Sequence, residues 1–364
     1  MPRCGILEVF MEKIKLAVVF GGKSSEYLIS LHSAASIMKN IPNDKFDVTL
    51  VGITEEGKWL YFPGNVEEID NNSWFENPNC CEMILSPNAT LKGFVKLNKD
   101  NTFETLTIDC VFPVLHGKNG EDGTIQGLCE IAGIPFVGCD TLSSAVCMDK
   151  EFTHIVCESA GIKTAPFMSV INEKTLDIKA LYEDAVNKLS LPIFIKPANA
   201  GSSHGISKIR SYEEFEAGLK LGFKHDKKVI LEKTIEGFEI GCAVLGNDEI
   251  QVGEVDEIEM YHDFFDYDEK YHSTTSKIHC PARISDDLKK EAKVMAAHIY
   301  KALRCSGMTR VDMFLTPNNE IILNEVNTIP GLTSVSRYPS MVRVGLGMGY
   351  TELIEELVNL AINR

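Results

Sequence analysis

The chain has 364 residues, of which 44% are hydrophobic, and its formal net charge is −16. This length and composition predict two or three globular domains and exclude a disordered chain, while the acidic balance argues against nucleic acid or an anionic membrane surface as a partner. No apolar run reaches the length of a membrane span, and eleven cysteines without a C-x-x-C pair are typical of a reducing cytoplasm.

The N-terminal part of the chain alternates strand-like and helical stretches. After an extension at residues 1–13, which lacks the features of a signal peptide, β-branched runs alternate with helical patterns up to residue 138. This alternation predicts βα units, a mostly parallel sheet and a Rossmann-like domain over residues 14–138. The G-x-G-x-x-G fingerprint of dinucleotide binding is missing, which argues against a nicotinamide-dependent oxidoreductase.

Two loops of this domain carry candidate functional residues. GGKSSEYLIS follows the first strand and predicts a capped helix start, where the acid Glu26 can meet a substrate ammonium group. HGKNGEDG places His116 and Glu121 in a glycine-rich loop at the end of a strand, where α/β sheets present ligands. A purely structural histidine is the alternative interpretation.

Residues 139–235 form a second predicted domain. A helical pattern at residues 143–161 leads to strand-like runs at residues 191–197 and 228–235. The stretch VILEKTIEGFE in this region suggests a strand whose backbone could hydrogen-bond an adenine edge, with Glu239 accepting from ribose hydroxyls. Spacing alone does not distinguish this from an ordinary strand.

A glycine- and serine-rich loop follows the strand that ends in Lys196. In ANAGSSHG, successive backbone N–H groups and the hydroxyls of Ser202 and Ser203 can converge on a triphosphate, and Lys150 and Lys196 can supply point charges to it. It is not a Walker loop, because no G-K-[ST] follows and both flanks are strand-like. A flexible hairpin with ordinary surface lysines is the alternative.

The third predicted domain covers residues 236–364. Its stretch 256–277 is polar, aromatic and acidic and follows neither a helical nor a strand period, which predicts a long functional loop. Further along, RVDMFLTPNNEIILNEVNTIPG (310–331) has two strand-like runs around a turn composition, which predicts a hairpin.

That hairpin predicts a metal site. With its turn centred on residues 318–319, Asp312 faces Glu325 and Arg310 faces Asn327 on one face of the ladder. Two carboxylates about 5 Å apart at their Cβ atoms repel each other unless they are protonated or bridged by a cation. Oxygen ligands from two acids and an amide suit Mg²⁺. The alternative is a solvated hairpin face.

Together, these stretches resemble the ATP-grasp superfamily and, within it, the D-alanine:D-alanine ligases and their vancomycin-resistance relatives. GGKSSEYLIS resembles the family's G-G-x-S-x-E start, HGKNGEDGTIQG its H-G-x-x-G-E-D-G segment, and NEVNTIPGLTSVSRYP its most distinctive signature. The resemblance runs from about Ile14 to the C-terminus. It implies an α/β fold of three domains, in which a Rossmann-like domain precedes an ATP-grasp fold of α+β character.

The resemblance also implies roles for individual residues. The phosphate-binding lysines, the adenine strand and the ribose ligand are matched by Lys150, Lys196, Glu232, Lys233, Ile235 and Glu239. The ligands of two Mg²⁺ ions, for which Mn²⁺ can substitute, are matched by Asp312, Glu325 and Asn327. The groups that hold the first D-alanine, the reacting carbonyl and the second substrate's carboxylate are matched by Glu26, His116, Arg310, Gly331, Ser336 and Lys270. A hydrogen-bonded set that closes the long loop over the site is matched by Glu26, Ser202 and Tyr271.

The implied activity is an ATP-dependent, ADP-forming ligation of D-alanine to a second D-amino acid through an acylphosphate, for peptidoglycan precursors, in a cytoplasmic homodimer. Stretches such as EVDEIE and SKIHCPARI resemble the VanG type, which joins D-alanine to D-serine; D-serine and D-alanine both stay open. The chain departs from the family at residues 27–30 and at Asn199-Ala200. The alternatives are another ATP-grasp carboxylate-amine ligase, a D-alanine:D-lactate ligase and a silent nucleotide-binding regulator.

Overall fold

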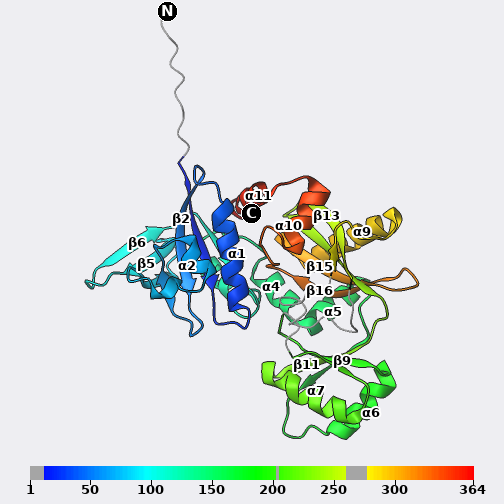
Figure 1. Cartoon of the computed structure of the whole chain (residues 1–364). Helices are drawn as coiled ribbons and strands as arrows, with labels where there is room; N and C mark the ends of the chain where they lie inside the picture. Colours follow the sequence, from blue (N-terminus) through cyan, green and yellow to red (C-terminus); the bar gives the residue numbers. More distant parts are fainter. Residues whose placement is uncertain (1–11, 202–204, 260–276) are drawn as a thin grey trace, which may run out of the picture.

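The structure, a computed structural model, describes residues 12–201, 205–259 and 277–364, which form three β-sheets with flanking helices (Figure 1). A seven-stranded sheet lies in the N-terminal part, a four-stranded sheet in the middle part and a five-stranded sheet in the C-terminal part. This mixture of sheets and helices confirms the predicted α/β class. None of the described helices is long and apolar enough to cross a membrane.

The N-terminal sheet has the strand order β6-β5-β4-β3-β2-β1-β7. Its strands are β1 (Ile14–Gly21), β2 (Phe46–Ile53), β3 (Trp59–Tyr61), β4 (Cys81–Leu85), β5 (Gly93–Leu97), β6 (Phe103–Thr107) and β7 (Cys110–Val114). The helical segments of this part are α1 (Tyr27–Asn40), α2 (Val66–Asp70), the 3₁₀ turn η1 (Trp74–Glu76) and α3 (Thr124–Ala132).

The prediction of a mostly parallel sheet is wrong for this part. Only β2, β1 and β7 pair in parallel, and β3 to β6 continue the sheet as antiparallel strands. Short connections at residues 54–58, 86–92 and 98–102 link antiparallel neighbours, whereas a parallel neighbour needs a crossover of about a dozen residues or more. Strand-like runs alone did not reveal this difference.

Strand β1 is buried on both of its faces. Leu16, Val18 and Phe20 point into one hydrophobic core, while Ala17 and Val19 point into another. A strand buried on both faces is expected at the centre of a parallel sheet and explains its unbroken apolar run. The first of these cores continues into the C-terminal sheet and its helices, so the N-terminal and C-terminal parts share one core.

The middle sheet has the order β10-β9-β11-β8 and its own hydrophobic core. Its elements are β8 (Phe167–Ile171), α6 (Ile178–Leu189), β9 (Ile193–Pro197), β10 (Ser207–Ile209), α7 (Tyr212–His225) and β11 (Lys228–Lys233). In Figure 1 helices α6 and α7 cover the lower side of this sheet, and its other side looks towards the C-terminal part. The loop predicted to bind phosphates therefore does connect two strands, β9 and β10, which pair antiparallel.

The single helical pattern predicted at residues 143–161 is two helices, α4 (Thr141–Met148) and α5 (Lys150–Ser159). The break is at Asp149, whose backbone is extended (φ −88°, ψ 103°) and whose side chain accepts from the N–H groups of Glu151 and Phe152. Asp149 is thus the N-cap of α5, a role for which aspartate is well suited. The break places Lys150 at the first turn of α5.

The C-terminal sheet has the order β14-β13-β12-β15-β16. Its strands are β12 (Phe238–Gly246), β13 (Ile250–Glu259), β14 (Lys277–His279), β15 (Gly307–Leu315) and β16 (Ile321–Asn327), and the helices are α9 (Asp286–Ala302), α10 (Arg337–Leu346) and α11 (Tyr350–Ile362). The loop predicted at residues 256–277 therefore begins too early, since β13 runs to Glu259. Asp256 and Glu257 are acidic but buried, because arginines neutralise them.

Candidate active site

A cavity of about 360 Å³ brings together residues from distant parts of the chain. Its walls include Glu26 at the start of α1, His116 after β7, Arg310 on β15, and Gly331 and Ser336 in the loop before α10. All five are residues that the sequence assigned to substrate binding. The fold therefore gathers this predicted set around one space between the N-terminal and C-terminal parts.

The predicted hairpin pairing is confirmed. Arg310 pairs with Asn327 and Asp312 pairs with Glu325 across β15 and β16. The pairs nearer the turn are one residue out of the predicted register, however, and a β-bulge takes up the difference by leaving Asn324 without a partner in the ladder. The sequence argument reached the right pairs without foreseeing the bulge.

The bulge decides which residues of β16 face the site. Leu323 and Val326 are both buried in the core, although strict alternation would put Leu323 and Glu325 on the same face. By adding one residue, the bulge turns Glu325 out of the core. It also directs the Asn324 side chain towards Lys196, whose ammonium donates to Asn324 Oδ1 over 3.3 Å.

Asp312 is the most deeply buried of the predicted metal ligands, with 1% of its surface exposed. Its carboxylate accepts hydrogen bonds from Arg310 Nε (2.9 Å) and Nη2 (2.7 Å) and from Asn327 Nδ2 (2.9 Å). Two carboxylates and an amide are oxygen ligands of the kind that Mg²⁺ takes, so the residues fit the ion. No group of three or more His, Cys, Asp or Glu side chains in the described chain could hold a metal, so phosphate and water oxygens would have to complete the shell.

Arg337 is a site residue that the sequence reasoning missed. Its guanidinium donates to Asp256 Oδ2 (2.7 Å) and Oδ1 (2.8 Å) and to Glu239 Oε1 (2.9 Å), and lies 3.4 Å from Asp312 Oδ1. Arg337 also lines the cavity, next to Ser336. The residue is in the quoted signature NEVNTIPGLTSVSRYP, but only its burial among three acids marks it. Glu239, the predicted ribose ligand, is one of these acids.

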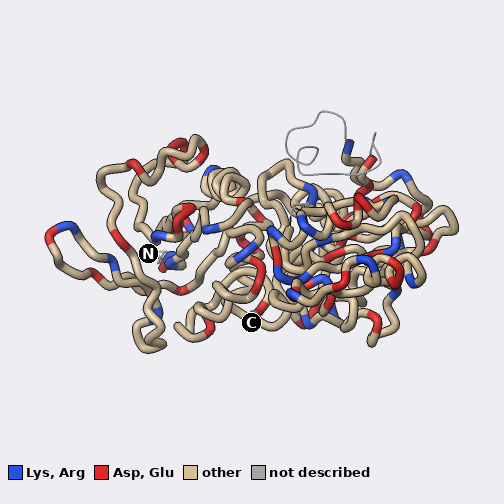
Figure 2. The backbone as a smooth tube through the Cα atoms, turned by 90° about the horizontal axis from the view of Figure 1, so that it is seen from below, with Lys and Arg blue, Asp and Glu red and all other residues tan. Residues whose placement is uncertain are grey.

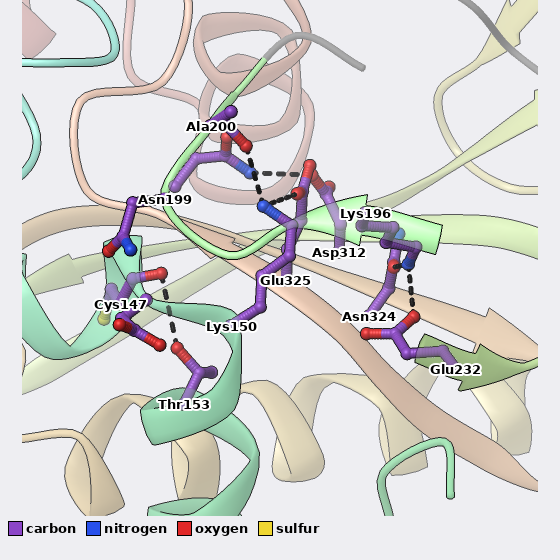
Figure 3. A network of polar contacts seen from close by, with 12 residues as sticks. Cys147, Lys150, Thr153, Lys196, Asn199, Ala200, Glu232, Asp312, Asn324 and Glu325 are labelled. Atoms are coloured by element: carbon purple, nitrogen blue, oxygen red, sulfur yellow. Dashed lines mark hydrogen bonds and ion pairs between the residues drawn. The ribbon is translucent and has the colours of Figure 1, made fainter. Parts of the chain in front are cut away.

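Lys150 reaches the acidic hairpin from α5 (Figure 3). It is 7% exposed, its backbone N–H donates to Ala198 O (3.0 Å), and its ammonium donates to Ala200 O (2.8 Å). The same ammonium lies 3.9 Å from Glu325 Oε2. The lysine therefore joins the glycine- and serine-rich loop to the predicted metal site.

Lys196 belongs to a second charged group, which lies to the right of Lys150 in Figure 3. Its ammonium lies 2.5 Å from Glu232 Oε2, and His154 Nε2 lies 3.5 Å from Glu232 Oε1. Burial alone would raise the pKa of Glu232, but Lys196 and His154 hold it below its usual range. Both predicted phosphate lysines are thus buried and paired with acids, unlike ordinary surface lysines.

Glu26 lies where two loops meet. A Cβ atom at Gly117 would come 2.2 Å from Glu26 Oε2, and one at Gly201 would come 3.0 Å from it. A side chain at Gly117 would displace the carboxylate from this position, and one at Gly201 would press tightly against it. The predicted ammonium-binding acid is therefore held between the loop after β7 and the predicted phosphate loop.

His116 and Glu121 tie the loop after β7 to the segment before Gly331. His116 Nδ1 lies 3.0 Å from Ile329 O, which can only accept, so this nitrogen carries the proton, and Nε2 accepts from Ser33 Oγ over 3.1 Å. Burial lowers the pKa of His116, which favours the neutral ring.

Glu121 accepts from Gly117 N (2.9 Å) and Ile329 N (3.0 Å) through its two oxygens. Burial and the neighbouring Glu26 raise the pKa of Glu121 to about 8, a shift that these two N–H donors oppose. The sequence placed Glu121 in a ligand-presenting loop but gave it no specific role, because backbone donors leave no mark in a sequence.

The remaining predicted residues of the described chain do not line the 360 Å³ cavity. Lys233 is exposed and Ile235 is half-buried; they lie at and just beyond the end of β11, and Glu232 is the buried acid described above. The predicted residues outside the described part of the chain are Ser202, Ser203, Lys270 and Tyr271.

Comparison with protein families gives two matches that together span most of the chain. Residues 15–139 match the model described as D-ala D-ala ligase N-terminus, and residues 156–359 match D-ala D-ala ligase C-terminus. A D-alanine--D-alanine ligase from Caldicellulosiruptor bescii is 45% identical over 356 residues, which covers 97% of this chain and 96% of the relative. D-alanine--D-alanine ligase A from Escherichia coli K12 is 41% identical over 362 residues and 97% of both chains.

Solved structures give the same result. The crystal structure of VanG D-Ala:D-Ser ligase from Enterococcus faecalis has a TM-score of 0.88 and 49% identity, and the match covers 96% of this chain and 100% of that one. A D-alanine-D-alanine ligase from Coxiella burnetii has a TM-score of 0.84 and 29% identity, with coverage of 97% and 95%.

Proposed function

The chain belongs to the D-alanine–D-alanine ligase family, whose members are ATP-dependent, ADP-forming ligases that join D-alanine to a second D-amino acid, and from this we propose that its preferred second substrate is D-serine. The similarity to the VanG enzyme, at 49% identity over nearly the full length, supports D-serine. D-alanine is the second candidate, favoured by the D-alanine–D-alanine ligases at 41–45% identity.

The gathering of the substrate residues around one cavity carries the proposed chemistry. Glu26 binds the ammonium of the first D-alanine and directs its carboxylate towards the γ-phosphate of ATP, which Lys150 and Lys196 hold. A carboxylate oxygen attacks the γ-phosphorus and ADP leaves, which yields an acylphosphate.

The second half of the reaction uses the opposite wall of the cavity. The amine of the second substrate attacks the acyl carbon, while Arg310 and the Gly331 N–H stabilise the oxyanion until phosphate leaves. Mg²⁺ held by Asp312, Glu325 and Asn327 would neutralise negative charge on the transferring phosphoryl group. By the family resemblance, Tyr271 and Ser202 would join Glu26 in closing the long loop over the site, so that exclusion of water protects the acylphosphate, and Lys270 would take the carboxylate of the second substrate; Tyr271, Ser202 and Lys270 lie outside the described residues.

The cellular setting is part of the same proposal. The ligase works on peptidoglycan precursors in the cytoplasm as a homodimer, and a D-alanyl-D-serine product would serve vancomycin resistance. Every cysteine in the described residues is a free thiol, which agrees with a reducing compartment.

Mass-spectrometric product analysis tests the proposed acceptor. The enzyme is incubated with ATP, Mg²⁺ and D-alanine alone, and then with equimolar D-serine or D-lactate added. We expect D-alanyl-D-serine to be the main product when D-serine is present. A main product of D-alanyl-D-alanine under competition would assign the second candidate, and failure to consume ATP with D-alanine would overturn the ligase assignment.

A further inference from the structure

A third lysine, Lys228, pairs with the two acids that flank Lys150 in the sequence. Lys228 begins β11, and its ammonium lies 2.7 Å from Asp149 Oδ2 and 2.5 Å from Glu151 Oε2. These two acids are the sequence neighbours of Lys150 on either side. Lys228 therefore holds the chain immediately before and immediately after the residue that is to bind phosphate.

The contact is sheltered from water. The side chains of Lys228 and Asp149 are each 13% exposed, that of Glu151 is 21% exposed, and the ring of Phe152 lies 4.8 Å below the ammonium. Burial alone would lower the pKa of Lys228, but the hydrogen bonds to Asp149 and Glu151 raise it, so the ammonium stays charged. Ion pairs in such surroundings are less screened than pairs on the surface.

Backbone contacts close a circuit through the same residues. The carbonyl of Lys228 accepts from Ala198 N (3.0 Å), and the carbonyl of Ala198 accepts from Lys150 N (3.0 Å). The ammonium of Lys150 then donates to Ala200 O in the predicted phosphate loop. Lys228 thus contacts both the start of α5 and the segment that follows β9. The relative position of these two segments decides where the Lys150 ammonium lies.

Helix α5 and strand β11 contribute to different hydrophobic cores, although His154 of α5 packs edge-on against Phe167 of β8, with the ring centroids 4.9 Å apart. Helix α5 contributes Cys157 to the core of the C-terminal sheet, whereas β11 contributes Val229 and Leu231 to the separate core of the middle sheet. Polar contacts therefore help to set the geometry at the junction between the two cores.

We propose that Lys228 is a positioning residue for the nucleotide: by pairing with Asp149 and Glu151 it fixes Lys150 against the loop that follows β9. The proposal rests on the proposed function, in which Lys150 binds the phosphates of ATP. Lys228 does not touch the nucleotide in this scheme and acts only through Lys150.

A double-mutant cycle tests this coupling. Lys228→Met should raise both the KM and the calorimetric Kd for ATP about tenfold and leave kcat within about twofold, the size expected for residues coupled in one network. Lys228→Arg should restore the wild-type values. Glu151→Gln, which weakens one pair only, should give a smaller rise and serves if Lys228→Met folds poorly.

The decisive comparison uses the Lys150→Ala variant as the starting protein. Because Lys228 acts only through Lys150, adding Lys228→Met to this variant should not change its Kd for ATP. Lys163→Met removes a single exposed lysine–glutamate pair, with Glu320 in the turn of the β15–β16 hairpin, and is the control that should leave the Kd unchanged. Equal effects of Lys228→Met in both backgrounds, or a fall in kcat with unchanged KM, would overturn the proposal. An unchanged Kd in Lys150→Ala alone would instead overturn the assignment of Lys150 to the phosphates.

Discussion

At the scale of the residue, the site is an arrangement of buried charges that compensate one another. Asp312 is surrounded by Arg310, Arg337 and the amide of Asn327, while Glu325 faces Lys150 and is 25% exposed. Removing one partner of a buried pair leaves the other uncompensated, which costs about 3–5 kcal/mol. Glu325, which is partly exposed, is therefore a better residue than Asp312 for testing the chemistry separately from folding.

Glu325→Gln tests the metal site. The substitution keeps the shape of the side chain but removes the charge that a Mg²⁺ ligand needs, so ADP formation should fall at least about 100-fold, and the Mg²⁺ concentration for half-maximal rate should rise. The melting temperature should stay within a few degrees, because Glu325 is 25% exposed. Glu320→Gln, on the exposed turn of the same hairpin, is the control. A wild-type Mg²⁺ dependence in Glu325→Gln would remove Glu325 from the ligand set.

At this scale, sequence reasoning selected residues that the structure brings together where a residue type has few uses. An acid, an amide and a second acid at one face of a hairpin, or a lysine at the end of an apolar strand, point to a charged ligand. It failed where the role depends on burial or on backbone donors, as for Arg337, Asp256 and Glu121. For some residues, among them Lys233 and Ile235, the predicted role comes only from the family resemblance.

At the scale of the element, irregularities place the chemistry. Asp149 breaks one helical pattern into α4 and α5 and so brings Lys150 to a helix start. The bulge at Asn324 exchanges the faces of β16. Periodicity describes regular segments, and a single extra residue in a strand leaves the composition unchanged. The pairs Asp312–Glu325 and Arg310–Asn327 were predicted correctly because two one-residue shifts cancel. The register near the turn differs by one residue from the prediction, and the bulge restores it.

Deletion of Asn324 tests the role of the bulge. Without Asn324, Glu325 would directly follow Leu323, so regular alternation would keep Leu323 and Val326 in the core and Glu325 on the site face, and the free energy of unfolding should fall by only about 1 kcal/mol, the worth of the lost hydrogen bond from Lys196. Asn324→Ala keeps the bulge and loses only the hydrogen bond from Lys196, so it should cost about 1 kcal/mol. Urea unfolding of both variants measures the difference. Equal stabilities are expected, because both variants lose the same hydrogen bond and keep Glu325 on the site face; a much larger loss on deletion would mean that the bulged backbone itself is needed to place Glu325.

At the scale of the whole molecule, the hydrophobic cores do not follow the three predicted domains, and the charges are spread along the chain. The N-terminal and C-terminal parts share a core, whereas the middle sheet has its own. Figure 2 shows acidic and basic positions mixed along the described backbone, in keeping with a net charge that comes from many sites. A sequence shows where apolar runs are, but the sharing of one core by segments hundreds of residues apart follows only from the three-dimensional arrangement.

Two buried histidines link the stability of the molecule to pH. His116 and His154 are 4% and 1% exposed, and burial lowers the pKa of each. The ring of His154 faces Glu232 on β11 and Lys196 on β9, and Lys150 and Glu158 lie on its own helix. In the unfolded chain both histidines titrate near pH 6.5.

The sign of the effect follows from proton counting. Below about pH 6.5 the unfolded chain takes up protons that the folded protein does not, so the free energy of unfolding falls as the pH is lowered from 6.5 towards the depressed pKa of each histidine. Each histidine contributes up to about 1.4 kcal/mol per pH unit in that window. His154→Gln should remove one of the two contributions and flatten the curve between pH 6.5 and 5.5, whereas His298→Gln, at an exposed position of α9, should leave the slope unchanged. Urea unfolding at half-unit pH steps measures this slope, and an identical slope in wild type and His154→Gln would show that His154 gains its proton equally in the folded and unfolded states.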